Sequence, residues 1–158
     1  MKRSRQGLAG VLLWVVFGLV GCAGERGTVR PAMLGPATMR LNPTFTRVQT
    51  GAVTADVELL DSFGDSVKGG GRLTFVLSEY RPRAGEVRGA AVGRPAQYDL
   101  DGRAAQEEHW VGVTDSYRFS LPWARLEARR AYVLEATYDA GGDAERQFDR
   151  LILRPAVR

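Results

Sequence analysis

Apolar and polar residues alternate along several short stretches of this chain, and this period of two restricts the fold more than any other feature. Between residues 53 and 60, every second position is apolar, and these positions hold Val53, Ala55, Val57 and Leu59. The positions between them hold Thr54, Asp56, Glu58 and Leu60. Because successive side chains of a strand point to opposite faces, the pattern predicts a strand with one face in a core.

Similar alternation predicts further strands at residues 73–77, 117–121 and 132–138, and the last of these forms a hairpin with residues 148–153. Weaker strands are expected at residues 39–48, where Pro43 suits a sheet edge, and at residues 97–100. Short helical turns are expected at residues 103–110 and 123–130. Together these elements predict an all-β fold, a single β-sandwich of about seven strands with a short helical turn or two in its loops.

The start of the chain has the pattern of a secretory signal peptide. Three basic residues, Lys2, Arg3 and Arg5, precede an apolar run over residues 8–20. This run is shorter than the roughly 18–20 apolar residues that a membrane-spanning helix needs, so a cleaved leader is the better interpretation.

The end of that run, Leu19-Val20-Gly21-Cys22, resembles the lipobox of bacterial lipoproteins. The resemblance implies a diacylglycerol on the Cys22 sulfur, cleavage before Cys22 and usually acylation of the new amino terminus. Two or three acyl chains would anchor the protein where one chain could not. The alternative is that Cys22 is an ordinary thiol near a conventional cleavage site. Apart from the lipid, no cofactor is expected.

The sequence predicts three segments: a signal peptide at 1–21, a lipid-anchored flexible tether at 22–37 and the β-sandwich domain at 38–158. The tether is rich in glycine and proline, and a flexible segment of this length reaches about 20–25 Å. Under the Gram-negative sorting rules that the lipoprotein resemblance brings in, Ala23 in place of Asp implies the outer membrane. We therefore expect a lipid-anchored protein of the cell envelope, facing the periplasm or the surface.

The charge and the cysteine content argue against a nucleic-acid-binding protein and against a disulfide-stabilised one. The net charge is +4, and Lys2, Arg3 and Arg5 supply three of those charges, so the mature chain is close to neutral and nucleic acid is not an expected partner. The arginines are dispersed among acidic residues, and the adjacent pair Arg129 and Arg130 is interpreted as a solvated turn. Cys22 is the only cysteine, so no intramolecular disulfide can form.

Two patterns resemble immunoglobulin-like domains. The strand-turn-strand pattern of residues 57–75 is similar to bacterial immunoglobulin-like and prealbumin-like domains. Leu126, six residues before Tyr132, resembles the tyrosine corner of immunoglobulin-like and fibronectin type III modules. That resemblance implies a hydrogen bond from the Tyr132 hydroxyl to the crossing backbone.

The sequence offers little that could support catalysis. His109 is the only histidine, and its neighbours Glu107 and Glu108 cannot converge with it on one side of a helix or strand. Asp99, Asp101 and Glu108 have the spacing of part of a calcium-binding EF-hand loop. Gln97 stands where that loop begins with aspartate, and Pro95 prevents a normal entering helix, so chance similarity is favoured. A Ca²⁺ site or a metal-dependent enzyme remains a remote alternative.

Trp110 and Trp123 have two interpretations. They could form an aromatic platform for a sugar, or they could be core residues beneath a loop, which is the commoner case for large aromatics. The sequence thus predicts a non-catalytic interaction or structural module of the envelope, with a protein or a polysaccharide as partner. The alternative function is an envelope carbohydrate-binding module that uses loop aromatics.

Overall fold

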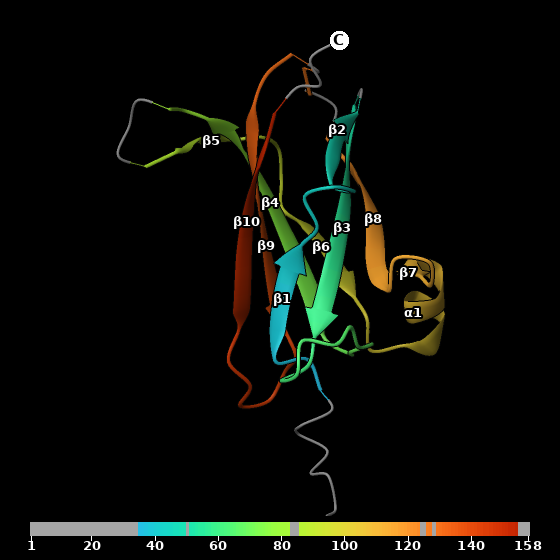
Figure 1. Ribbon diagram of the computed structural model, residues 1–158. Helices are drawn as coiled ribbons and strands as arrows, with labels where there is room; N and C mark the ends of the chain where they lie inside the picture. Colours follow the sequence, from blue (N-terminus) through green and yellow to red (C-terminus); the bar gives the residue numbers. More distant parts are fainter. Residues whose placement is uncertain (1–34, 50, 83–85, 124–125, 128, 155–158) are drawn as a thin grey trace, which may run out of the picture.

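The protein is an all-β sandwich of two antiparallel sheets, which confirms the predicted fold class (Figure 1). The computed structural model describes residues 35–49, 51–82, 86–123, 126–127 and 129–154. The predicted signal peptide, the lipobox with Cys22, and residues 22–34 of the predicted tether lie outside the described residues.

The first sheet contains five strands in the order β1-β3-β8-β7, with β2 also paired to β3. Their bounds are β1 Thr38–Leu41, β2 Arg47–Gln49, β3 Ala52–Leu60, β7 Trp110–Val111 and β8 Ser116–Pro122. β1 and β2 pair with different halves of the same edge of β3. Pro43 lies in the connection between them, so the edge expected at residues 39–48 is two short strands.

The second sheet has the order β10-β9-β4-β5, with β6 also paired to β4. Its strands are β4 Arg72–Tyr80, β5 Arg88–Ala91, β6 Ala96–Asp99, β9 Tyr132–Asp139 and β10 Gln147–Leu153. The predicted hairpin of β9 and β10 is present with seven paired positions. The structure has about ten strands where about seven were predicted, because the edge expected at residues 39–48 is split into β1 and β2 and because β5 and β7 were missed.

The strand order is that of immunoglobulin-type sandwiches. In the first sheet, β1, β3, β8 and the two-residue β7 have the positions of strands A, B, E and D of that architecture, and in the second sheet β4, β9 and β10 have those of strands C, F and G. Each sheet therefore contains strands that are distant in the sequence, and the chain crosses between the sheets at both ends.

Alternate side chains of both sheets fill the space between them. The fully buried side chains include Leu59, Leu73, Phe75, Tyr117, Phe119 and Leu134. Phe75 and Phe119 meet across the two sheets with ring centroids 5.2 Å apart. The prediction of one core from the alternating apolar positions is confirmed.

Of the two predicted helical turns, one is a helix. The helix α1 covers Arg103–His109, and the Gln106 side-chain amide donates a hydrogen bond to the Leu100 carbonyl oxygen at 3.0 Å. No helix is present among the described residues of 123–130, which include neither residues 124–125 nor residue 128. In this segment the Leu126 N–H donates to the Trp123 carbonyl oxygen at 3.2 Å, and the Arg130 N–H donates to the Glu127 carbonyl oxygen at 3.0 Å.

Tyr132 connects the crossing segment after β8 to the start of β9. Its hydroxyl accepts a hydrogen bond from the Glu127 N–H at 2.9 Å and lies 3.4 Å from the Glu127 carbonyl oxygen. Leu126, next to that residue, is buried in the core. These contacts fix the segment that carries the chain from the first sheet to the second.

The triple-glycine loop before β4 passes closely over two tyrosine hydroxyls. The Gly69 N–H donates to the Tyr117 hydroxyl at 3.2 Å, and the Tyr138 hydroxyl donates to the Gly70 carbonyl oxygen. A Cβ atom on Gly69 would lie 2.8 Å from the Tyr138 hydroxyl. Glycine is therefore required where this loop closes the lower end of the sandwich in Figure 1.

Tyr138 makes the stability of the fold sensitive to alkaline pH. Burial, followed by the nearby Tyr117, Asp101 and Asp139, raises the pKa of Tyr138 from 10.0 to about 12. The folded state therefore holds this proton more tightly than the unfolded state, so its contribution to stability is complete below pH 10 and is lost as the pH rises toward 12. Denaturation midpoints measured from pH 9 to pH 12 should fall across this window.

The variant Tyr138→Phe tests whether Tyr138 causes this alkaline loss of stability. It should lower stability at pH 8 and flatten the fall between pH 10 and 12, although burial raises the pKa of Tyr117 in the same direction and some of the fall will remain. An unchanged alkaline profile in this variant would contradict the role given to Tyr138.

Candidate functional site

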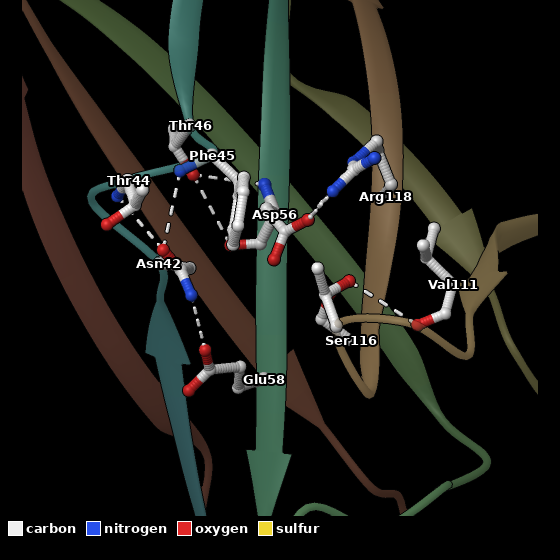
Figure 2. Close-up of polar contacts among 10 residues, drawn as sticks. Asn42, Thr44, Phe45, Thr46, Asp56, Glu58, Val111, Ser116 and Arg118 are labelled. Atoms are coloured by element: carbon white, nitrogen blue, oxygen red, sulfur yellow. Dashed lines mark hydrogen bonds and ion pairs between the residues drawn. The ribbon is translucent and has the colours of Figure 1, made fainter.

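Two buried carboxylates lie on the outer face of the first sheet (Figure 2). Asp56 on β3 is 0% exposed, and its Oδ2 accepts hydrogen bonds from Arg118 of β8 at 3.1 Å (Nε) and 2.7 Å (Nη2). The backbone N–H of Asp56 donates to the Thr46 hydroxyl at 3.0 Å. Asp56 Oδ1 is buried and has no hydrogen-bond partner among the described residues.

Glu58 lies two positions further along the same face of β3. Its carboxylate accepts hydrogen bonds from the Arg40 guanidinium and, at 2.5 Å, from the Asn42 side-chain amide. In Figure 2 the connection between β1 and β2 lies beside β3, with Asn42 bonded to Glu58 and Phe45 next to Asp56. The Phe45 ring centroid lies 5.6 Å from the Arg118 guanidinium. The cluster thus holds this connection against the sheet, and each carboxylate is paired with an arginine.

The upper end of the second sheet, as seen in Figure 1, is rich in arginine. Arg81 follows the end of β4, Arg130 precedes the start of β9, and Arg154 follows the end of β10. These strands are neighbours, and the register places Leu153 opposite Tyr132, so the three arginines lie at one level of the sheet. We call Arg81, Arg129, Arg130 and Arg154 the arginine-rich end. All four are exposed.

Two glutamates order part of the arginine-rich end. Glu79 lies 3.4 Å from Arg130 and 3.7 Å from Arg81, and Glu127 lies 2.9 Å from Arg130. Among the described residues, Arg129 and Arg154 have no such ion pair, so their guanidinium groups face solvent with their donors available.

The opposite end of the sandwich is predominantly acidic. It includes the loop from β3 to β4, the end of β6 and the turn from β9 to β10. The acidic residues there are Asp61, Asp65, Asp99, Asp101, Asp139, Asp143 and Glu145, and the basic ones are Lys68, Arg72 and Arg146. β1 begins at this acidic end, because Thr38 pairs with Leu60.

The structure does not bring together the carboxylates that resembled a calcium loop. Asp99 lies at the end of β6, Asp101 in the following loop and Glu108 on α1. No group of three histidine, cysteine, aspartate or glutamate side chains within the described ranges could hold a metal ion. Asp99 Oδ1 instead accepts a hydrogen bond from the Asp101 N–H at 3.0 Å, as turn-forming aspartates do.

The two tryptophans do not form an aromatic platform. Trp123 is only 4% exposed, and its indole N–H donates to the Arg94 carbonyl oxygen at 3.1 Å. Trp110 is half-buried on β7, where it packs against Tyr117 at 5.1 Å and lies beneath the Lys68 ammonium. Trp123 therefore belongs to the core, which is the commoner of the two interpretations considered for these residues.

His109 packs among aromatic rings at the end of α1. Its ring centroid lies 4.6 Å from that of Phe119 and 5.3 Å from that of Tyr98. The end of α1 turns the ring toward β6 and β8, so His109 is half-buried against the aromatic side chains of these strands.

Comparisons with known proteins assign no family. The chain matches no protein-family model, and it has no match among curated proteins. Within the described ranges, no helix has the length and apolar character needed to cross a lipid bilayer.

Proposed function

We propose that this protein is a lipid-anchored component of the bacterial cell envelope that binds an acidic partner protein and catalyses no reaction. The observation that carries the proposal is the separation of charge between the two ends of the sandwich. The folded strands begin at the acidic end, and the arginine-rich end lies at the other end of the long strands.

The position of the arginine-rich end relative to the lipobox supports this role. A strand of nine residues, such as β4, spans about 30 Å. With Cys22 held at a membrane, the tether leads to the acidic end, and the arginine-rich end is displaced from it by that length. The arginines are then at the end that is free to meet another molecule.

The chemistry of the arginine-rich end favours an acidic protein surface. Guanidinium groups bind carboxylates through paired hydrogen bonds, and Arg129 and Arg154 make no ion pair with another described residue. Loops at the ends of immunoglobulin-type sandwiches carry recognition in other proteins of this architecture. Charges at the rim of such a contact mainly raise the association rate.

Charge reversal at the arginine-rich end tests the proposal. In cells that express the tagged full chain, cross-linking and mass spectrometry should recover one stoichiometric protein partner, and the double variant Arg129→Glu/Arg154→Glu should lose it. With the recovered partner, this variant should reduce the association rate about tenfold or more, because two charges change sign and the net charge falls by four units without breaking an ion pair in the described structure.

Two controls make the result specific. Arg103→Glu reverses an exposed charge on α1, away from the arginine-rich end, and should retain the partner. Cys22→Ser removes the proposed lipid site and should release the protein from the membrane fraction. Recovery of glycan with no protein, or an unchanged partner in the double variant, would contradict the proposal.

A further inference from the structure

A polar trough crosses the outer face of the second sheet at its acidic end. Three adjoining hollows form it, with cavity volumes of about 210, 300 and 390 Å³. The third extends past the edge of β10 to residues 36–38 at the start of β1 in the other sheet. The first two share Arg72 and Asp139, and the last two share Arg146. Neighbouring strands are about 4.8 Å apart, so the course from β6 across β4 and β9 to β10 is about 15 Å long. This shape suits an extended ligand better than a compact one.

Direct cross-strand pairs form the floor of the trough. Thr74 on β4 is paired with Gln97 of β6 and with Thr137 of β9, and Thr137 is paired with Phe148 of β10. Directly paired residues place their side chains on the same face, so two hydroxyl groups, an amide and an aromatic ring form one row. Phe148 is 57% exposed.

Several polar groups in the trough are free to bind a ligand. The side chains of Thr74, Thr137 and Gln97 make no hydrogen bond with another side chain in the part of the chain that the structure describes. Gln147 is not one of these groups, because it is paired with the buried Tyr138 and so lies on the opposite face of the sheet, where its side-chain amide donates to the Pro36 carbonyl oxygen at 3.2 Å. The groups available to a ligand on the outer face are therefore the two threonine hydroxyls and the Gln97 amide.

The charges of the trough disfavour an ionic ligand. Asp139 accepts hydrogen bonds at 2.9 Å from both the Gly141 N–H and the Arg146 Nε, and these contacts hold its pKa below the usual range. Arg72 lies 3.9 Å from Asp99. The acidic residues would repel an anionic polymer. A cation would bind weakly, because these carboxylates are already paired with arginines. Neutral hydroxyl groups can bind to both members of each pair.

We propose that this trough binds a neutral oligosaccharide, which lies across the strands with one sugar ring stacked on Phe148. The hydroxyl groups of the ligand would bind Thr74, Gln97 and Thr137, and an aromatic ring provides a flat apolar surface for the C–H face of a sugar. The site is distinct from the arginine-rich end, so it goes beyond the proposed function and does not depend on it.

Calorimetry on the full lipidated chain, in a zwitterionic detergent without sugar headgroups, tests the proposal. The probes are oligomers of N-acetylglucosamine and of glucose with four to six units, and an oligogalacturonate of the same length is the charged comparison. We expect a neutral oligomer to bind, and Phe148→Ala or Thr137→Val to weaken its binding about tenfold. Ile152→Ala is the matched control, because Ile152 is an exposed apolar residue on the same face of β10, opposite Val133 and outside the row.

The outcomes separate this site from its alternatives. No binding of either neutral oligomer, preference for the oligogalacturonate, or equal loss in Ile152→Ala would overturn the proposal. An arginine-rich peptide that competes for the site and dissociates at high salt would show that the trough binds basic protein segments instead. Arg129→Glu/Arg154→Glu should leave sugar binding unchanged, so failure of the proposed function and failure of this site are distinguishable.

Discussion

Replacement of Arg118 by methionine is expected to lower the free energy of unfolding by about 3 kcal/mol, because it leaves a charged carboxylate buried without its partner. Arg118 provides both side-chain hydrogen bonds to Asp56 Oδ2, and the other oxygen, Oδ1, already lacks a partner among the described residues. Equilibrium unfolding in urea measures the change. Arg103→Met is the control, since its pair with Glu107 is exposed and should contribute at most about 0.5 kcal/mol.

A further result should accompany this loss if an unpaired charge is its cause. The double variant Asp56→Leu/Arg118→Met should recover much of the stability, because an apolar pair can replace a buried ion pair. If the double variant recovers nothing, the loss in Arg118→Met would instead indicate lost packing against Phe45.

Gly71→Ala is expected to destabilise the fold by about 3 kcal/mol or more. Gly71 has φ +126, which L side chains rarely adopt, and a Cβ atom would lie 2.5 Å from the Asp139 carbonyl oxygen and 2.9 Å from the Ala140 Cα. Both neighbours are backbone atoms of the turn after β9, so neither can move aside without displacing the hairpin. Strain and overpacking each typically cost about 1–3 kcal/mol.

Gly112→Ala serves as the comparison for this variant. A Cβ atom on Gly112 would meet only the Trp110 indole nitrogen at 3.9 Å, which is ordinary contact, and its φ is not in the strained range. We expect a change within about 0.5 kcal/mol. If Gly71→Ala unfolded at the same urea concentration as Gly112→Ala, the loop before β4 would not have the close packing described for it.

Alternation identified the central strands of the sandwich because their burial follows a simple rule. β3, β4, β8 and β9 each place alternate apolar side chains in one core, and all four were predicted. β5 was missed because Arg88-Gly89-Ala90-Ala91 has no apolar alternation, and a register shift interrupts its pairing with β4. Edge strands of this kind are determined by their neighbours more than by their own residues.

On the polar face of β3, alternation predicted the direction of the side chains but not their burial. Asp56 and Glu58 were placed correctly on the face opposite the apolar residues, but both are buried, because residues 42–46 cross over them. The pattern of one strand cannot reveal a segment that covers it from elsewhere in the chain.

The clustering of arginines at one end of the sandwich could not be predicted from the order of residues in the sequence either. Arginines and acids are intermingled in sequence, so they were interpreted as dispersed, and Arg129 and Arg130 as a solvated turn. The antiparallel fold sorts them, since Arg81, Arg130 and Arg154 are brought to one end from three separate strands. The trough depends in the same way on pairing between β6, β4, β9 and β10, which no local pattern specifies.

The split edges of the two sheets bear on how copies of this protein behave when crowded together. An uninterrupted edge strand can template hydrogen bonding with a neighbouring chain and so begin aggregation. Here Pro43 interrupts the edge formed by β1 and β2, and Pro95 lies between β5 and β6. β7 has only two residues, and the Asp149 carboxylate on β10 accepts the Leu41 N–H at 2.7 Å. At the high surface density of an anchored protein, such edges would favour dispersed monomers over fibrils.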